Sequence, residues 1–307
     1  MLLTLGVFVA LASSVVAQNF SLVGFGAGTT GGGSAASTTV TSCSALVSAV
    51  AASGAKVVTL TSTLSGCGII DISSNKTVIG SGSSAGLTGG GFRIKSASNV
   101  IIRNLNFGPP PSGEDTISLN KATQVWIDHN YIHTVGLTGD KDDYDGQLDI
   151  THASDLVTVS WNKFADHWKA SLVGHSDSNE SEDTGHLRVT YHHNIWSNIN
   201  SRTPSLRFGT GHVYNSLFTG VPTSGINSRM GAQVLVENNI FTNVVLAMVT
   251  DLDSDEPGYL TSTGNVLNNS TTRITQTASW KPSYSYTLDS TSALEAQLNS
   301  YVGPGKI

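Results

Sequence analysis

Short runs in which hydrophobic and polar residues alternate recur along most of the chain, and each run reaches an asparagine followed by another apolar residue. These asparagines lie 21 to 32 residues apart, at Asn104, Asn130, Asn162, Asn194, Asn215 and Asn239, with a fainter copy at Asn265. Alternation with a period of two predicts short, half-buried strands. A repeat of about 20 to 30 residues that tolerates insertions predicts stacked coils. We therefore predict an all-β protein, a right-handed single-stranded parallel β-helix.

The recurring asparagine distinguishes a solenoid from other β architectures. Asparagine tolerates left-handed backbone geometry, and its amide can hydrogen-bond to the asparagines of the coils above and below. A β-sandwich also has many short alternating strands, but it does not require the same residue at the same point of each unit. We expect the asparagines to stack along one bend of the solenoid.

Two segments have helical spacing instead. In Ser42–Ser53 the apolar residues Leu46, Val47 and Val50 recur at the spacing of one helix face. Because a solenoid has an open apolar end, we expect this short helix to cap the N-terminal end. The repeats fade after about Thr272, and the spacing predicts a second short helix on the flank at Ser292–Tyr301.

The N-terminal segment Met1–Ala17 carries no charged side chain and is mostly apolar. Its run Leu5–Ala12 is typical of the hydrophobic region of a signal peptide, and Val15 and Ala17 occupy the positions that precede a cleavage site. The segment is too short and too rich in serine for a membrane span. We expect residues 1–17 to be removed during secretion, and residues 18–307 to form one domain, since no linker rich in Pro and Gly divides them.

Composition narrows the function classes. Only 12% of the residues are charged, and Gly and the small polar residues are abundant, which favours short strands and turns over a helical bundle. The formal net charge of −6 argues against nucleic acid as a partner, because phosphate binding requires clustered Lys and Arg. No second apolar segment is long enough for a bilayer, so we expect no membrane association.

The chain has two cysteines, Cys43 and Cys67. In an oxidising compartment the natural interpretation is one disulfide, which would stabilise the fold by about 3 kcal/mol on the chain-entropy estimate. Two unpaired buried thiols are the alternative. Glycosylation sequons agree with secretion, although a chain rich in Ser and Thr also produces them by chance, and they begin at Asn19, Asn75, Asn179, Asn268 and Asn269.

Three acidic residues are candidates for a metal site. Asp145 and Asp149 lie four residues apart with Gly146 between them, so a tight bend can turn both carboxylates toward one point. Asp115 lies about one coil earlier. Three converging carboxylates form a site of hard oxygen ligands that suits Ca²⁺. The alternative is a solvated acidic loop, because further aspartates lie close by in the sequence.

Three cationic residues follow the acids. Arg202 and Arg207 are five residues apart, and Pro204 stiffens the turn between them. Lys169 lies about one coil before Arg202. Cations next to carboxylates on adjacent coils could hold an anionic polymer, with Ca²⁺ bridging one carboxylate to another. A set of surface salt bridges among the same residues is the alternative.

Other motifs are better explained by structure than by chemistry. Gly26–Gly31 matches a dinucleotide-binding fingerprint, but no strand precedes it and no periodic helix follows, which favours a glycine-rich coil. Ser176 lacks the strand and tight turn of a nucleophile. His192 and His193 lie in a strand-like run, so we expect them to pack there and not to bind zinc. Asp128 could be catalytic, but its place in a repeat favours a structural hydrogen bond.

Taken together, the motifs resemble polysaccharide lyase family 1, the pectate lyases. The matching segments run in order along the chain, and they are Val125-Trp-Ile-Asp-His129, Asp145-Gly-Gln-Leu-Asp149, Trp168-Lys169 and Arg202-Thr-Pro-Ser-Leu-Arg207. The resemblance covers about Cys43 to Asn269. The low charge and the abundance of Gly and Ser are similar to the fungal or oomycete members.

The resemblance implies a role for each candidate. Asp115, Asp145 and Asp149 match the calcium ligands of the family, and Lys169 matches a lysine that binds a substrate carboxylate. Arg202 matches the proposed general base. The second arginine of that motif, Arg207, matches a residue that contacts the substrate. The substrate implied is polygalacturonate, and we expect a monomer.

The implied reaction is a β-elimination. Ca²⁺ and Lys169 would withdraw electron density from the galacturonate carboxylate, Arg202 would take the proton at C5, and the C4–O4 bond would break to give a 4,5-unsaturated product. Arginine is an unusual base because it is normally protonated. Neighbouring positive charges disfavour the protonated guanidinium, so an alkaline pH optimum is predicted.

Three alternatives remain open at this point. The related pectin lyases have an arginine in place of calcium-binding acid, whereas all three acids are present here. A polygalacturonase would need paired carboxylates as acid and base, and Arg93-Ile-Lys95 imitates an element of that family but lies before the acids instead of after them. A solenoid that binds polysaccharide without cleaving it would leave no new chain ends.

Overall fold

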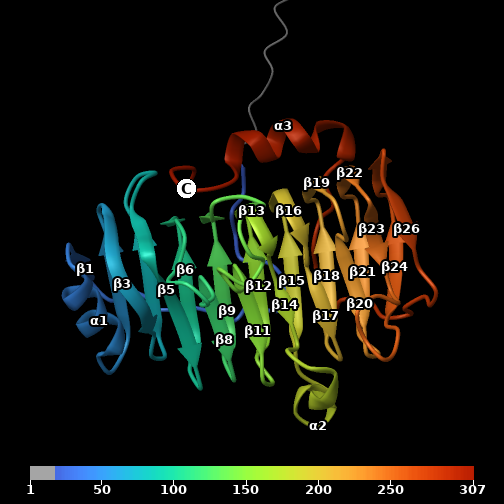
Figure 1. The fold of residues 1–307 in the computed structure, drawn as a ribbon. Coiled ribbons are helices and arrows are strands. Elements are labelled where there is room, and N and C mark those ends of the chain that lie inside the picture. Colours follow the sequence, from blue (N-terminus) through green and yellow to red (C-terminus); the bar gives the residue numbers. More distant parts are fainter. Residues whose placement is uncertain (1–17) are drawn as a thin grey trace, which may run out of the picture.

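A computed structural model describes residues 18–307 of the protein, and the predicted signal peptide, residues 1–17, lies outside the described residues. The chain winds into a parallel β-solenoid, drawn in Figure 1 as a row of stacked coils. All strand pairings within its sheets are parallel. This confirms the predicted parallel β-helix. Within the described part there is no helix with the length and hydropathy needed to cross a lipid bilayer.

Each coil contributes strands to three faces. The first face is a ten-stranded sheet made of β1 (Ser37–Val40), β2 (Lys56–Leu60), β4 (Lys76–Gly80), β6 (Ser98–Arg103), β9 (Thr123–Asp128), β12 (Asp155–Ser160), β15 (Arg188–His192), β18 (Thr210–Tyr214), β21 (Gln233–Glu237) and β24 (Tyr259–Thr263).

The second and third faces are halves of one larger sheet, joined by the long strand β5 (Gly86–Lys95), which also pairs with β3 (Thr63–Asp71). The second face continues through β7 (Asn106–Phe107), β10 (Tyr131–His133), β13 (Lys163–Lys169), β16 (Ile195–Ser201), β19 (Leu217–Val221), β22 (Ile240–Val244) and β25 (Val266–Asn268). The third face consists of β8 (Ile117–Asn120), β11 (Leu148–Thr151), β14 (Leu172–Val173), β17 (Ser205–Arg207), β20 (Ile226–Arg229), β23 (Leu246–Val249) and β26 (Thr271–Arg273).

Aromatic rings stack along the interior of the second face. Phe164, Trp196, Phe218 and Phe241 occupy the same inward position on successive coils and are fully buried. The ring centroids of Phe164 and Trp196 are 4.2 Å apart, and those of Phe218 and Phe241 are 4.4 Å apart. Burial of each large side chain contributes about 1.5–3 kcal/mol, so this column fixes the register of the coils that carry the candidate site.

The predicted stack of asparagines is present and runs through Asn130, Asn162 and Asn194, then Ser216, then Asn239 and Asn265. The Asn130 amide donates to the Asn162 side-chain oxygen at 3.0 Å, and Asn239 donates likewise to Asn265 at 2.9 Å. Such stacked amides satisfy one another inside the fold.

Two predicted members of the stack are displaced by one position. Asn104 and Asn215 precede the stack, where Leu105 and Ser216 take the place of asparagine. Both asparagines have positive φ, 59° and 46°, whereas the stacked asparagines do not. The expectation that the stacked residues themselves are left-handed is therefore wrong. The left-handed bend lies one residue earlier, and His129 fills it in one of the coils.

Both predicted helices exist. Helix α1 (Cys43–Ala51) covers the N-terminal end of the solenoid (Figure 1), and the Ser42 side chain caps it by accepting the N–H of Ala45. Leu46 and Val50 are buried against the strands beneath, but Val47 is 43% exposed, so the buried face is narrower than the sequence suggests. The disulfide Cys43–Cys67 ties this helix to β3, as expected.

The second helix, α3 (Thr291–Tyr301), lies along the outside of the coils (Figure 1). Its buried residues Leu294 and Leu298 pack with Trp161, Ile195 and other apolar side chains in a small separate cluster. Two short helical turns that the sequence did not predict, η1 (Asp177–Asn179) and α2 (Glu180–Asp183), project from the loop after β14.

Candidate active site

The predicted acids Asp115 and Asp149 converge on Gly146, at the edge of the third face. The N–H of Gly146 donates to Oδ1 of Asp115 at 2.7 Å, and Oδ1 of Asp149 accepts the N–H of Leu172 at 3.0 Å. A Cβ on residue 146 would clash with the Asp149 carboxylate and lie 2.9 Å from Oδ1 of Asp115. Only glycine leaves room for both carboxylates, which explains why the two acids can meet here.

Burial makes these two carboxylates difficult to ionise. It raises the pKa of Asp115 to about 6, opposed by the Gly146 N–H and reinforced by the charge of Asp145. Burial, and then the charge of Asp115, raises the pKa of Asp149 well above its ordinary value, although the positive charge of Arg202 acts in the opposite direction. Two carboxylates thus share one site, and within residues 18–307 neither of them forms a salt bridge.

The third acid, Asp145, faces a cation. Nζ of Lys169 donates to Asp145 at 2.9 Å and to the exposed Asp142 at 2.6 Å. Partial burial alone would lower the pKa of Lys169, but these two carboxylates raise it above its ordinary value. Of the surface salt bridges considered as an alternative for the six candidate residues, the structure contains the one between Asp145 and Lys169.

Arg202 lies on the coil next to the acids. It follows β16 with a positive φ of 62°, and its carbonyl accepts the N–H of Ser171 at 2.8 Å. Lys169 pairs in register with Ser201, the residue before Arg202. The coil stacking thus brings Lys169 and Arg202 side by side, next to Asp149.

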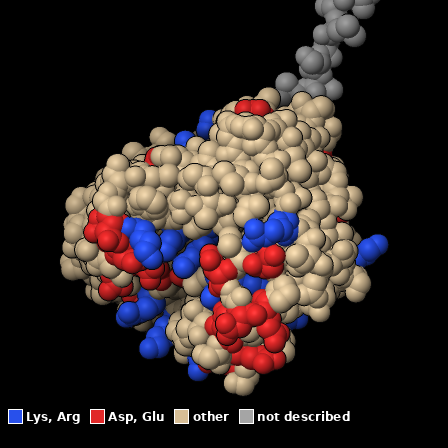
Figure 2. All heavy atoms as spheres, turned by 45° about the vertical axis from the view of Figure 1, so that its right-hand side comes forward, with Lys and Arg blue, Asp and Glu red and all other residues tan. Residues whose placement is uncertain are grey.

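These cations line a groove of about 470 Å³ between the second and third faces. Among the described residues, five cations line it, Lys141, Lys169, Arg202, Arg207 and Arg229, against a single carboxylate, that of Asp253. Trp168 borders the groove, together with amide and hydroxyl groups from Asn200, Ser201, Ser205, Thr223, Ser224 and Asn227. In Figure 2, charged side chains gather in the lower half of the visible surface, and the upper half is mostly uncharged. The arrangement can hold several carboxylates of a linear polymer at once.

Arg207 is held in place by residues that the sequence did not single out. Its Nε donates to Asp177, and its Nη1 donates to the carbonyl of Gly174 at 2.9 Å. Asp177 also accepts the hydroxyl of Ser254 at 2.8 Å. Partial burial would raise the pKa of Asp177, but Arg207 and these other donors lower it. Asp177 therefore connects two loops and orients one guanidinium.

Arg229 is a further cation that sequence reasoning missed. It pairs in register with Arg207 on the next coil. Burial, and then the positive charges of Arg207 and Arg202, lower its pKa to about 10. The signal was present, because Arg229 follows Arg207 by one repeat length, but a lone arginine near no motif did not stand out.

The donor set fits Ca²⁺, although it is not arranged as a complete site. Within residues 18–307, no three His, Cys, Asp or Glu side chains stand as ligands of one metal ion, since Asp145 is turned toward Lys169. The nearby groups are carboxylate oxygens, the ligands that Ca²⁺ prefers. A divalent cation would compensate the buried charges of Asp115 and Asp149, so the residues present are suited to such an ion.

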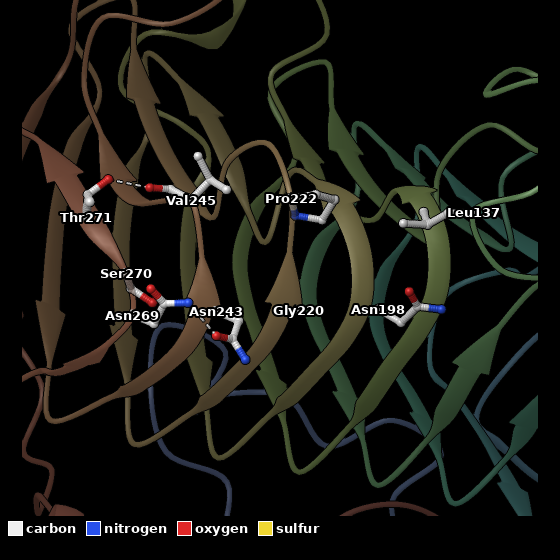
Figure 3. A pocket seen from close by; sticks show the side chains of 9 residues that line it. All are labelled: Leu137, Asn198, Gly220, Pro222, Asn243, Val245, Asn269, Ser270 and Thr271. Carbon is white, nitrogen blue, oxygen red and sulfur yellow. Dashed lines mark hydrogen bonds between the residues drawn. The ribbon is translucent and has the colours of Figure 1, made fainter.

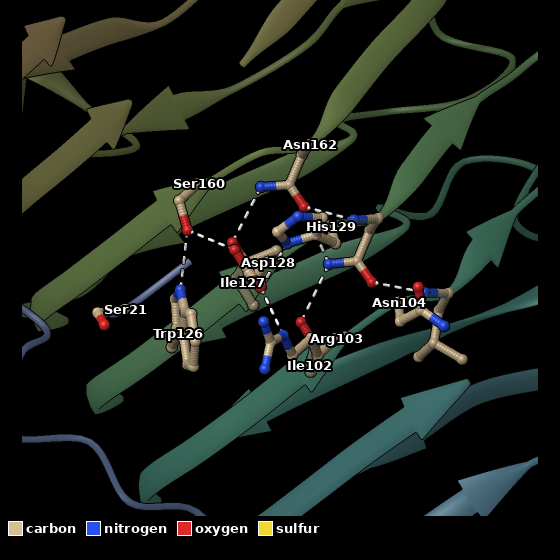
Figure 4. Close-up of polar contacts among 12 residues, drawn as sticks. Ser21, Ile102, Arg103, Asn104, Trp126, Ile127, Asp128, His129, Ser160 and Asn162 are labelled. Atoms are coloured by element: carbon tan, nitrogen blue, oxygen red, sulfur yellow. Dashed lines mark hydrogen bonds and ion pairs between the residues drawn. The ribbon is translucent and has the colours of Figure 1, made fainter. Parts of the chain in front are cut away.

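Asp128 belongs to a separate polar network on the first face (Figure 4). It accepts hydrogen bonds from Nε of Arg103 at 2.6 Å and from the hydroxyl of Ser160 at 2.6 Å, and it lies 2.7 Å from Nδ1 of His129. The indole of Trp126 donates to Ser160 at 2.9 Å. This agrees with the structural interpretation of Asp128.

The remaining sequence motifs also have structural explanations. Gly26–Gly31 forms an irregular coil along the first face, where the N–H of Gly26 donates to Thr158. Ser176 caps the turn η1. His192 and His193 are buried, and their Nδ1 atoms lie 2.9 Å apart.

A groove rich in cations, on the outer surface of a parallel β-helix, is typical of a protein that binds an anionic polysaccharide. A family model described as pectate lyase matches residues 2–307. Pectate lyase B of Colletotrichum gloeosporioides is 42% identical over 92% of this chain and 85% of its own length, and pectate lyase A of Aspergillus niger is 45% identical over 88% and 82%.

Solved structures agree with these relatives. A Bacillus sp. N165 pectate lyase in complex with trigalacturonate has a TM-score of 0.85 and 30% identity, covering 93% of this chain and 99% of its own. A Xanthomonas campestris pectate lyase has a TM-score of 0.81 and 30% identity over 93% and 98%. The chain belongs to the pectate lyase family, and it is a polysaccharide lyase that acts on pectate.

Proposed function

We propose that the protein is a secreted, calcium-dependent pectate lyase that cleaves α-1,4-linked polygalacturonate by β-elimination, with Arg202 as the general base. The observation that carries this proposal is the juxtaposition of two carboxylates, the partly buried Asp115 and the buried Asp149, with Lys169 and Arg202 on adjacent coils. The proposal includes removal of residues 1–17 and a monomer formed by the single domain 18–307.

Substrate binding follows from the groove. Lys169 would exchange the exposed Asp142 for a galacturonate carboxylate, since an exposed ion pair contributes little stability. Arg207, anchored by Asp177 through Nε and by the Gly174 carbonyl through Nη1, keeps its remaining N–H groups for the substrate. Asp115, Asp145 and Asp149 would hold a Ca²⁺ ion, which would supply positive charge next to the substrate carboxylate.

The proton transfer would be performed by Arg202. The C5 proton of galacturonate is weakly acidic, and its removal places negative charge on the adjacent carboxylate, which Lys169 stabilises. Arg202 accepts this proton, the electron pair forms the C4–C5 double bond, and the C4–O4 bond breaks to release the leaving chain. An alkaline pH optimum is expected, because an arginine side chain is normally protonated and must lose a proton before it can act as a base.

The test is polygalacturonate turnover, measured as ultraviolet absorbance of the unsaturated product, for wild type, Arg202→Ala and a control, Arg93→Ala. Arg93 pairs with the exposed Asp71, so its variant should keep wild-type activity. We expect Arg202→Ala to lose the absorbance signal and to keep binding polygalacturonate. New reducing ends without absorbance would show a hydrolase, and binding without new chain ends would show a polysaccharide-binding solenoid.

A further inference from the structure

A shallow trough of about 800 Å³ lies next to the charged groove, on the outside of the second face (Figure 3). Two rows of side chains line it along the solenoid axis. One row carries amides and the other is largely aliphatic: Asn198, Gly220, Asn243 and Asn269 with Ser270 form the first row, and Leu137, Pro222, Val245 and Thr271 form the second. None of these nine residues is charged, whereas five cations line the groove.

The amide row comes from a column of left-handed residues, one from each coil. Asn198, Asn243 and Asn269 have φ values of 54°, 56° and 48°. Nδ2 of Asn269 donates to Oδ1 of Asn243 at 2.7 Å, and Asn198 donates to Asp166 at 2.7 Å. Successive coils are about 4.8 Å apart, so these amides face outward at intervals that suit the hydroxyl groups of a polymer.

Gly220 interrupts this column and creates the hollow. Its φ of 66° matches that of its asparagine neighbours, and a Cβ placed on it would meet only the backbone N of Asn198, at 4.0 Å. The missing side chain separates Asn198 from Asn243 and leaves a gap next to Pro222. The exposed side chain of Val245, 55% accessible, forms an apolar wall of the gap.

The trough and the groove are continuous parts of one surface. Strand β16 contributes Asn198 to the trough and Asn200 to the groove, and Pro222 of the trough is followed by Thr223 of the groove. Thr223 also donates to Asn200 at 2.9 Å. A polymer held in the groove can therefore extend into the trough without leaving the protein surface.

The chemistry of the trough selects uncharged sugar. A free carboxylate there would lose water and gain no cation, which is unfavourable. An esterified galacturonate has no charge, and its ring face and methyl group can contact Val245 and Pro222 while its hydroxyls bond to the amides. We propose that this trough binds methyl-esterified galacturonate residues of the same polymer whose free carboxylates occupy the groove. The inference rests on the proposed function.

The variant Gly220→Asn tests this proposal with little risk to folding. Asparagine accepts the left-handed backbone and meets no close neighbour, and it would complete the amide column while filling the hollow. Gly66→Asn is the matched control, because Gly66 has a φ of 69° and its added Cβ would also meet nothing within 4 Å, far from the trough. Protein from a bacterial host avoids a glycan at the Asn269 sequon.

Kinetics on polygalacturonate and on partially methyl-esterified pectin of equal chain length give the readout. We expect Gly220→Asn to raise KM on the esterified polymer about fivefold, which corresponds to about 1 kcal/mol, with its kinetics on polygalacturonate unchanged. Gly66→Asn should match wild type on both. Val245→Lys should shift the preference toward unesterified polymer. Equal effects of Gly220→Asn on both substrates, or none on either, would overturn the proposal.

A direct binding measurement separates this proposal from the proposed function. In gels that contain fully esterified pectin, migration of wild type should be retarded and migration of Gly220→Asn should not be, even if no unsaturated product forms in any assay. Equal migration of the two proteins would overturn the trough as a site. Equal retardation of wild type by a neutral galactan would overturn its assignment to esterified galacturonate.

Discussion

Two buried aspartates, Asp128 on the first face and Asp149 at the groove, lie in opposite surroundings. Asp128 is fully buried and is matched by Arg103, His129 and Ser160. Asp149 is 8% exposed, accepts one backbone N–H, and has the carboxylate of Asp115 as its neighbour. Evolved structures rarely leave a buried charge uncompensated without a functional reason. The comparison indicates that Asp128 stabilises the fold and that Asp149 serves to bind a ligand.

Among the predicted effects on activity, replacing the proposed base, Arg202, should have the largest. Arg202→Ala should lower kcat on polygalacturonate by about 10²–10⁴-fold, the usual contribution of a general base. Its thermal unfolding should be unchanged, because the side chain has no ion-pair partner among the described residues. Stopped absorbance assays and calorimetry on the same preparations check both statements. A large fall in melting temperature would show that Arg202 stabilises the fold instead of acting as the base.

Neutralising Asp128 should lower stability and spare activity, whereas neutralising Asp149 should abolish activity and spare stability. Asp128→Asn leaves Arg103 and His129 without their anion and should lower the free energy of unfolding by about 3 kcal/mol, with the activity of the folded enzyme retained. Asp149→Asn should abolish calcium-dependent activity and leave the metal-free protein as stable as wild type or more so. Denaturant unfolding with a chelator, compared between the two variants, measures this. Equal destabilisation would remove the distinction.

Calcium should stabilise wild type through the site that contains Asp115 and Asp149. A ligand at 100 times its dissociation constant adds about 2.7 kcal/mol to the free energy of unfolding. We expect that calcium raises the melting temperature of wild type and Asp128→Asn but not of Asp149→Asn. Scanning calorimetry with calcium or chelator distinguishes the cases. A calcium shift that survives in Asp149→Asn would place the ion elsewhere.

The pH dependence of the metal-free protein should show the raised pKa of Asp115. Because the folded pKa of about 6 lies above the ordinary value of 3.8, this group lowers stability as pH rises from about 4 to 6. His212, whose pKa burial lowers to about 4, acts in the opposite sense and loses stability as pH falls below about 6.5. The difference in unfolding free energy between wild type and Asp115→Asn isolates the first effect. A difference independent of pH would contradict the raised pKa.

The smallest effect should come from the residue that orients Arg207. Asp177→Asn weakens the hold on that guanidinium and should raise KM for polygalacturonate by about threefold to tenfold, which is about 1 kcal/mol, with kcat retained. Asp251→Asn, which removes an exposed partner of Arg273, is the control. A loss in kcat at constant KM would show that Asp177 acts on the chemical step.

The sequence was sufficient for features that repeat or form local motifs. The coils, the asparagine stack and both main helices follow from periodicity, and the Cys43–Cys67 bridge is the pairing expected of the two cysteines. The sequence also places Asp145 and Asp149 on either side of Gly146, but it does not show that Asp145 turns toward Lys169 while Asp115 meets Asp149. The residue before each stacked asparagine carries the left-handed bend, because that position, and not the amide, turns the chain. Sequence patterns one residue apart cannot separate these two positions.

Other features depend on contacts between distant loops. Asp177 reaches Arg207 from a loop with no periodic pattern, and its link to Ser254 joins residues far apart in the chain. Arg229 becomes important only because coil stacking places it next to Arg207. The trough at Gly220 exists because glycine has no side chain at that point of the column, and no sequence motif indicates such a hollow.

The most direct test is the rate of unsaturated product formation from polygalacturonate by wild type and Asp149→Asn, each measured in chelator and after calcium is restored. Wild type should be inactive in chelator and recover fully with calcium, and Asp149→Asn should stay inactive in both. Full wild-type activity in chelator, or recovery of Asp149→Asn with calcium, would contradict a calcium site at these acids beside Arg202.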